Sequence, residues 1–165
     1  MVWSALGRGA SWAHRRSDAR GRSPVIYVDT SALAAVFFRE ATARQVLKAL
    51  RAESRTPMVI SAWTLTELAS VGSIKARTGA VSPAERATAL GAFQRFVSAK
   101  LRIVEVEPAD FRTATVLVEQ SADLRAGDAL HLAIARRIDA RLATLDRRLG
   151  ATAAVQGLST LTLVS

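Results

Sequence analysis

Four acidic residues stand where apolar, strand-like runs give way to helix-like stretches. Carboxylates beside apolar segments are costly to bury unless they are paired or bind a cation. Mg²⁺ prefers oxygen ligands and retains several waters, so a few carboxylates are enough to hold it. Because the rest of the chain is basic, the pattern predicts a metal-dependent enzyme that acts on a polyanion. The four residues are Asp29, Glu67, Asp128 and Asp146.

Each of these acids also has a purely structural interpretation. Asp29 and Asp146 could cap the helices that follow them, and Asp128 falls in a first helical turn, where the helix dipole favours a negative charge. Glu67 has no basic residue three or four positions away to pair with. Its structural interpretation is that it lies on an exposed side of its helix. Taken singly the four residues leave both interpretations open, and their joint placement favours a shared site.

Composition predicts one globular domain with an anionic partner. The chain has 165 residues, half of them hydrophobic, and a formal net charge of +9. A surface that is merely rich in arginine is the alternative to an anionic partner, since net charge speaks to partners and not to chemistry. The chain has no cysteine, which excludes disulfides, zinc–thiolate sites and thiol nucleophiles.

Residues 1–24 are rich in Gly, Ser, Ala and Arg and predict a disordered N-terminal extension before a domain at 25–165. A nucleic-acid-binding arm is the functional alternative. No apolar run follows Arg15 and Arg16 directly, so a twin-arginine signal is not predicted. The longest apolar stretch is interrupted by Asp29 and predicts no membrane span, so a cytoplasmic location is expected.

The order of elements predicts an α/β fold with a parallel sheet and helices on both faces. In such sheets the binding crevice lies beyond the carboxyl ends of the strands, where Asp29 and Asp146 are expected. Ser82 to Glu85 forms a capping box with proline at the first helical position. The predicted strands are 25–28, 58–60, 103–106, 141–145 and 161–164, and the predicted helices are 31–38, 41–52 and 62–77, with others beginning at 83, 108 and 127.

Four short segments resemble the motifs of the PIN domain family, and among its branches they are most similar to the VapC-type toxin ribonucleases of prokaryotic toxin–antitoxin pairs. The resemblance spans roughly residues 25–165, and the third segment is the most specific. The segments are Val-Asp-Thr-Ser-Ala-Leu (28–33), Thr-Glu-Leu-Ala-Ser (66–70), Arg-Ala-Gly-Asp-Ala-Leu-His-Leu-Ala-Ile-Ala (125–135) and Ala-Thr-Leu-Asp-Arg-Arg-Leu (143–149).

The resemblance implies a three-layer α/β/α sandwich around a mostly parallel sheet. It also implies an RNA substrate, a cognate VapB-like antitoxin whose tail blocks the active groove, and a homodimer. Ser31 and Thr144 would be the polar residues that orient ligands and water. The resemblance assigns the catalytic positions around Mg²⁺ or Mn²⁺ to Asp29, Glu67, Asp128 and Asp146.

The expected reaction is hydrolysis of RNA phosphodiester bonds by a metal-activated water. Arg125, Lys75 and Arg77 are candidate contacts to RNA phosphates, and solvated helix ends are the alternative for each. His131, one turn after Asp128, is expected to pack or hydrogen-bond nearby rather than to act as a general base or ligand.

Three other functions are alternatives to this one. A receiver-like signalling domain needs a lysine after a late strand, and no lysine follows Lys100. A phosphatase of the haloacid dehalogenase type needs a second Asp two residues after the first, where this chain has Ser31. A non-catalytic, PIN-like RNA-binding domain stays open as the alternative outside enzymology.

Overall fold

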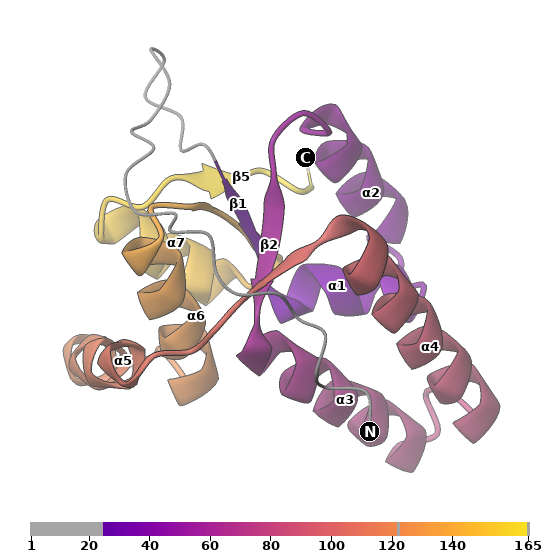
Figure 1. The fold of residues 1–165 in the computed structure, drawn as a ribbon. Coiled ribbons are helices and arrows are strands. Elements are labelled where there is room, and N and C mark those ends of the chain that lie inside the picture. Colours follow the sequence, from indigo (N-terminus) through magenta and orange to yellow (C-terminus); the bar gives the residue numbers. More distant parts are fainter. Residues whose placement is uncertain (1–24, 122, 165) are drawn as a thin grey trace.

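The structure is a computed structural model that describes residues 25–121 and 123–164. The predicted extension at 1–24 lies outside the described residues. Strands and helices alternate along the described chain (Figure 1). The elements are β1 (Ile26–Val28), α1 (Thr30–Phe37), α2 (Ala43–Ala52), β2 (Met58–Ser61), α3 (Ala62–Arg77), α4 (Pro83–Lys100), β3 (Arg102–Val104), α5 (Pro108–Gln120), α6 (Ala126–Arg137), β4 (Arg141–Ala143), α7 (Arg147–Val155) and β5 (Thr160–Leu161).

The strands form one parallel sheet in the order β3-β2-β1-β4-β5. In the register of the central strands, Tyr27 of β1 lies opposite Val59 of β2 and Leu142 of β4. The predicted α/β fold with a parallel sheet is therefore confirmed. Because β1 is the middle strand, the residue that follows it, Asp29, lies at the centre of the sheet's carboxyl edge.

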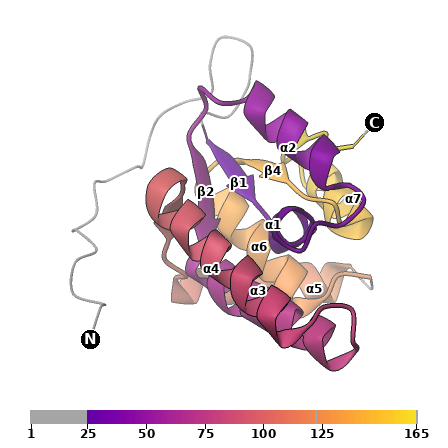
Figure 2. The same cartoon turned by 90° about the vertical axis from the view of Figure 1, so that its right-hand side faces the viewer.

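Helices cover both faces of the sheet and give it two separate cores. Side chains alternate across a strand, so Ile26 and Val28 pack with residues of α1 to α4, while Tyr27 packs with residues of α5, α6 and α7. All three side chains are almost completely buried, as expected for the middle strand of a parallel sheet. The two helical layers lie on opposite sides of the sheet in Figure 1, and Figure 2 views the molecule from the α1–α4 side.

Three predicted strands extend too far at their carboxyl ends, because their partner strands end first. β2 ends at Ser61, which pairs with Val104, so the predicted strand residues 105–106 have no partner. β4 ends at Ala143 beside the last residue of β1, and β5 then ends at Leu161. The predicted helix at 62–77 and the capping box that opens α4 are confirmed.

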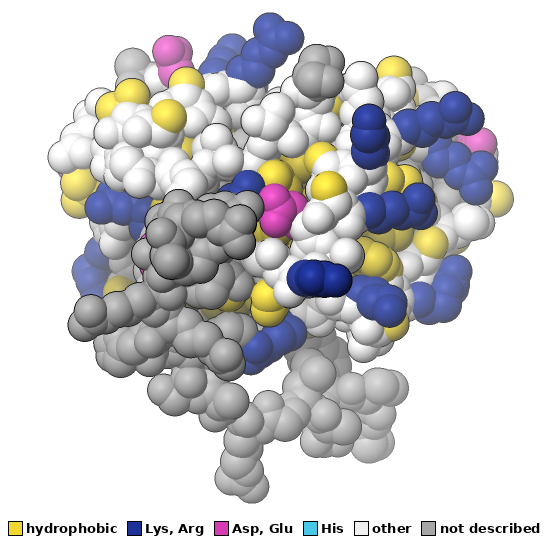
Figure 3. All heavy atoms as spheres, turned by 90° about the horizontal axis from the view of Figure 1, so that it is seen from above, with side chains coloured by type: hydrophobic (Ala, Val, Ile, Leu, Met, Phe, Trp, Pro, Cys, Tyr) yellow, Lys and Arg dark blue, Asp and Glu magenta, His cyan; other side chains and the backbone are white. Residues whose placement is uncertain are grey.

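Positive charge is spread over the molecular surface. Lys and Arg side chains are scattered across the face that Figure 3 shows, which looks down on the molecule of Figure 1. On α2, for example, Arg44, Lys48 and Arg51 are exposed while Val46 and Leu50 are buried. No described helix combines the length and the apolar character that crossing a bilayer requires.

Candidate metal centre

Asp29 lies in the turn between β1 and α1 and is the N-cap of α1, with only 4% of its surface exposed. Its Oδ2 atom accepts hydrogen bonds from the Ser31 hydroxyl (2.6 Å), the Ser31 backbone N–H (3.3 Å) and the Thr144 hydroxyl (2.8 Å). The capping role considered for Asp29 is therefore present. Because these bonds all go to Oδ2, they fix the direction in which Oδ1 points.

Ser31 and Thr144 also hold the ends of β1 and β4 together. The Ser31 hydroxyl accepts the backbone N–H of Leu145 (2.9 Å), and the Thr144 hydroxyl accepts the backbone N–H of Asp146 (2.9 Å). Each hydroxyl thus donates a hydrogen bond to Asp29 and accepts one from a backbone N–H of the loop after β4. Both residues lie beside Asp29, and the ligand-orienting role that the family resemblance implies for them stays a prediction.

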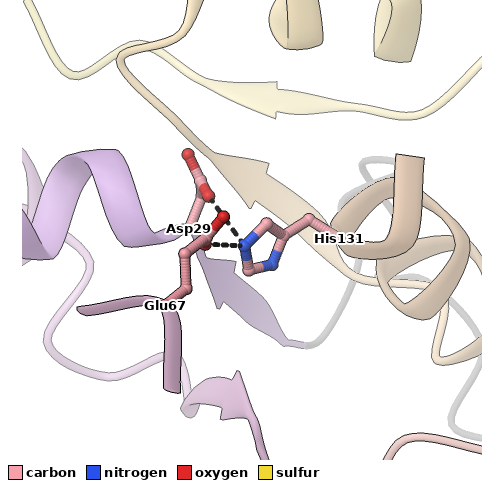
Figure 4. A group of neighbouring side chains, drawn as sticks. All are labelled: Asp29, Glu67 and His131. Carbon is pink, nitrogen blue, oxygen red and sulfur yellow. Dashed lines mark hydrogen bonds and ion pairs between the residues drawn. The ribbon is translucent and has the colours of Figure 1, made fainter. Parts of the chain in front are cut away.

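Three side chains from distant parts of the chain meet at this edge of the sheet (Figure 4). His131 Nε2 on α6 lies 2.6 Å from Glu67 Oε2 on α3 and 3.3 Å from Asp29 Oδ1. One potential ligand atom from each of Asp29, Glu67 and His131 lies within 4.8 Å of the others. They form an acidic cluster of a kind that can hold a metal ion.

The imidazole of His131 is buried, and its Nδ1 atom, which faces away from the carboxylates, is held by Tyr27 of β1. Its Nδ1 lies 2.6 Å from the Tyr27 hydroxyl, and the two rings meet edge to face. Tyr27 donates in turn to the Ser61 hydroxyl at 2.8 Å. Burial raises the pKa of Tyr27 well above its usual value, so the phenol remains a hydrogen-bond donor at every physiological pH.

The pKa values of Glu67 and His131 shift in the directions expected for an ion pair. Burial alone would raise the pKa of Glu67, but the hydrogen bond and the charge of His131 outweigh it and hold that pKa below its usual value. Burial would likewise lower the pKa of His131, and the bond to Glu67 together with the charge of Asp29 raises it instead. Protonation of His131 would therefore offset part of the acidic charge in the metal-free chain.

The start of α6 approaches Glu67 so closely that a Cβ atom at Gly127 would require the carboxylate to give way by a few tenths of an ångström. A Cβ atom on Gly127 would lie 3.0 Å from Glu67 Oε1 and 3.7 Å from the indole nitrogen of Trp63. That indole nitrogen is buried and has no hydrogen-bond partner among the described residues. A side chain at position 127 would therefore press on the Glu67 carboxylate.

Asp128 and Asp146 lie around this cluster rather than inside it. Burial, followed by the charges of Asp146 and Asp29, raises the pKa of Asp128, so these carboxylates lie near enough to repel one another. Asp146 is the N-cap of α7, where its Oδ1 accepts the backbone N–H groups of Arg148 (2.8 Å) and Leu149 (3.0 Å). The capping role considered for Asp146 is therefore also present.

The three candidate RNA contacts lie in different surroundings. Arg125 is exposed at the N-cap of α6, next to the acidic edge. Lys75 pairs with Glu40 at 2.7 Å, and Arg77 ends α3 some ten residues after Glu67, or roughly 15 Å along the helix. The position of Arg125 suits a phosphate contact best, and RNA binding by all three remains a prediction.

Sequence reasoning missed two residues that shape the centre, Tyr27 and Gly127. It expected His131 to hydrogen-bond nearby, but not that its partners would be the Glu67 and Asp29 carboxylates. Two signals point to them. Asp29 follows β1 with an extended backbone, two residues after Tyr27, so it continues the alternation of the strand and faces the same side of the sheet as Tyr27. Gly127 and His131 are four residues apart on a helix and share one face. That face packs against α3 and supplies the partner that Glu67 lacks on its own helix.

The donor set suits a hard divalent cation. Asp29 and Glu67 contribute carboxylate oxygens, and the chain has no cysteine to favour a soft metal. Burial, together with the charges of Asp146 and Asp29, raises the pKa of Asp128. Carboxylates that repel in the free chain are brought together at a cost, which a bound cation removes. The residues present therefore fit Mg²⁺ or Mn²⁺.

Comparisons with known proteins agree with the observed fold. The family model of the PIN domain matches residues 26–155. Protein PAE2754 from Pyrobaculum aerophilum shares the fold with a TM-score of 0.56 and 25% identity, over 84% of this chain and 86% of that one. No curated protein sequence matches the chain at a significant level.

Two further solved structures share the fold at lower identity. VapC20 of Mycobacterium tuberculosis, described as a Sarcin-Ricin loop cleaving toxin, has a TM-score of 0.61 and 20% identity, over 84% of this chain and 98% of that one. A chain of a toxin–antitoxin complex from Klebsiella pneumoniae has a TM-score of 0.56 and 20% identity, over 84% and 99% of the two chains.

Proposed function

Because the chain belongs to the PIN domain family, we propose that it is a metal-dependent endoribonuclease and the toxin of a toxin–antitoxin pair. Members of the family are typically metal-dependent ribonucleases. The observation that carries the proposal is the convergence of Asp29 and Glu67, from β1 and α3, with Asp128 near enough to be destabilised by its neighbours. The proposed nuclease domain is residues 25–165.

In this proposal the acidic residues bind the cation in two ways, directly or through water. Asp29 and Asp128 are direct ligands, and Glu67 and Asp146 complete the site or bind through water. Ser31 and Thr144 hold Asp29 Oδ2, so that Oδ1 presents a fixed lone pair to the ion. A bound Mg²⁺ or Mn²⁺ would supply the Lewis acidity that activates water and offsets charge on the phosphoryl group.

RNA is the proposed substrate because a phosphodiester fits both the acidic centre and the basic surface around it. The net charge of +9 favours binding of a polyanion. Arg125, exposed beside the centre, is positioned to contact a phosphate and so keep the substrate in register. VapC20, which shares the fold, is described as a toxin that cleaves the Sarcin-Ricin loop.

We propose a cognate antitoxin as the protein partner and a homodimer as the working assembly. The antitoxin proposal rests on the toxin–antitoxin complex from Klebsiella pneumoniae, whose chain shares this fold. Both proposals follow the family resemblance of the four motifs. In such a pair, an antitoxin segment that covers the carboxyl edge of the sheet would block access of RNA to Asp29 and Glu67.

The test is RNA cleavage by the purified, free chain, with Mg²⁺ or Mn²⁺ and with a chelator. We expect cleavage that the chelator stops and that Asp29→Asn reduces at least ~100-fold, because a neutral amide is a far weaker ligand than a carboxylate. Asp139→Asn makes the same change of charge at an exposed position beyond the far end of α6 and should cleave like the wild type.

The alternative, a non-catalytic RNA-binding domain, makes the opposite prediction. It would bind RNA without metal-dependent degradation, and Asp29→Asn would change nothing. Undiminished cleavage by pure Asp29→Asn would equally reject the assignment of the site. Use of the free chain matters, because a toxin in complex with its antitoxin would be inert.

A further inference from the structure

His131 makes a pattern of contacts that fixes where its protons lie. Its Nε2 atom faces two carboxylate oxygens, Glu67 Oε2 at 2.6 Å and Asp29 Oδ1 at 3.3 Å. Ionised carboxylates only accept hydrogen bonds, so Nε2 must carry a proton and donate. The Thr30 hydroxyl, also at 3.3 Å, completes the surroundings of this nitrogen. The side chain is fully buried, so no water competes for the proton.

The other ring nitrogen of His131, Nδ1, is held by a series of hydrogen bonds that leads through Tyr27 to the start of α3, the helix that bears Glu67. Nδ1 contacts the Tyr27 hydroxyl at 2.6 Å, and the Tyr27 hydroxyl donates a hydrogen bond to the Ser61 hydroxyl at 2.8 Å. Ser61 is the N-cap of α3, where its hydroxyl accepts the backbone N–H of Thr64. The ring is thus fixed between β1 and the start of α3, and it contacts Glu67 six residues after Ser61 on that helix.

This arrangement disfavours two more obvious roles for His131. A general base needs a free lone pair on the nitrogen that faces the substrate, and Nε2 already holds a proton between two carboxylates. A ligand to Mg²⁺ would likewise need a bare nitrogen, and Mg²⁺ prefers oxygen. What remains is the role of a donor that orients the oxygens on which a cation would act.

We propose that His131, aimed by Tyr27, is a positioning residue that locks the Glu67 and Asp29 carboxylates in the orientation that receives the cation. The proposal rests on the metal-dependent function proposed above and deepens it. Without the Nε2–H donor, Glu67 would lose its 2.6 Å hydrogen bond to His131 and would be held less firmly, since a quarter of its side chain is exposed. The cation would then bind a disordered ligand set and lose affinity.

The test is calorimetric titration of Mn²⁺ into the full chain and four variants. His131→Leu removes the donor at similar volume and should weaken Mn²⁺ binding about 10-fold to 100-fold. His131→Gln restores an N–H near the position of Nε2 and should stay within about threefold of the wild type. Tyr27→Phe keeps the packing, releases the ring, and should cost on the order of fivefold. Leu132→Met, a buried change at the next position of α6, should leave Mn²⁺ affinity unchanged.

A spectroscopic measurement separates a positioning residue from a ligand. Pulsed electron paramagnetic resonance on the Mn²⁺-loaded wild type should show no directly coordinated nitrogen. A nitrogen coupling typical of a bound imidazole would overturn the proposal and make His131 a ligand. Equal loss of affinity in His131→Gln and His131→Leu would overturn it as well, because a restored donor would then have no effect.

The outcomes also keep this proposal distinct from the proposed function. If the wild type binds no Mn²⁺ and cuts no RNA, both proposals fall. If the wild type binds Mn²⁺ and cuts RNA while His131→Leu and Tyr27→Phe bind Mn²⁺ equally well, only the positioning role is wrong. Should His131→Leu fail to fold, Tyr27→Phe alone decides, since it changes a single buried hydroxyl.

Discussion

At the scale of single residues, the centre is built from groups that are unfavourable to bring together in the free chain. Asp128 shows this most clearly, because burial and the charges of Asp146 and Asp29 raise its pKa. Folded Asp128 therefore holds its proton more tightly than an unfolded Asp. The metal-free protein accordingly loses stability as the pH rises through the pKa of this carboxyl.

Asp128→Asn should make the metal-free protein more stable and inactive. The amide stays neutral, so the repulsion that acts on Asp128 at neutral pH disappears. We expect a thermal midpoint about 2–4 °C above the wild type at pH 7 in the presence of a chelator. The gain should vanish at a pH low enough to protonate Asp128 in both states. A variant that is less stable than the wild type at pH 7 would contradict the repulsive environment.

Gly127→Ala tests the close approach of α6 to Glu67. Alanine normally stabilises a helix by up to about 1 kcal/mol relative to glycine. Here its Cβ would press on Glu67 Oε1 at 3.0 Å, so we expect Mn²⁺ affinity to fall roughly tenfold with little gain in stability. Gly91→Ala in α4 is the control, since its Cβ would meet only the flexible end of Arg95 at 3.5 Å.

In that control we expect a gain of about 0.5–1 kcal/mol in unfolding free energy and unchanged Mn²⁺ affinity. Equal behaviour of the two variants would show that Gly127 has no special contact with Glu67. Calorimetry and chemical denaturation on the same preparations measure both quantities.

At the scale of elements, the sequence predicted the βα order but not which side chains would meet across it. The residues after β1 and β4 were predictable, because parallel strands share a carboxyl edge. The strand lengths were not, since a strand ends where its neighbour ends and register cannot be read from one segment. The bonds of His131 to Glu67 were not predictable either, because they depend on how α6 packs beside α3.

The position of α6 is fixed at its other end by a partly buried ion pair with α5. Arg137 donates to both oxygens of Asp110, at 2.7 and 3.0 Å, and to the backbone carbonyl of Glu105 at 2.8 Å. Asp110 is 2% exposed, and its Oδ2 also accepts the backbone N–H of Glu107 at the start of α5. One guanidinium thus ties the β3–α5 connection to the helix that carries His131.

Arg137→Leu should cost about 3 kcal/mol of unfolding free energy, because it leaves a buried carboxylate without its partner. Arg136→Leu, one residue earlier, removes an exposed arginine that bonds only Gln156 among the described residues. We expect that control to cost less than about 0.5 kcal/mol. Urea denaturation measures both, and similar costs for the two would mean that the Asp110 pair does not anchor α6.

At the scale of the whole molecule, an acidic centre lies in a chain of net charge +9, with cations scattered over the face that Figure 3 shows. Attraction for RNA should therefore be general and electrostatic, and the centre should select only where hydrolysis occurs. Single-stranded RNA that contacts about four cations would lose on the order of 50-fold in affinity between 50 and 200 mM salt.

Asp29→Asn is the suitable variant for this binding experiment, because the RNA stays intact. Fluorescence anisotropy at a series of salt concentrations measures the slope. Arg125→Ala should weaken binding and make the slope shallower by about one phosphate contact, or roughly 0.7. Affinity that does not depend on salt would rule out phosphate contacts as the source of binding.

The central claim is that Asp29, Glu67 and their acidic neighbours hold one divalent cation at the carboxyl edge of the sheet. Anomalous diffraction from crystals soaked in Mn²⁺ tests it most directly. We predict a manganese peak against the carboxylate oxygens of Asp29, within reach of Asp128 and directly or through water of Glu67, and no such peak in Asp29→Asn crystals. Wild-type crystals that show no peak there at millimolar Mn²⁺, or a peak only elsewhere, would contradict the account.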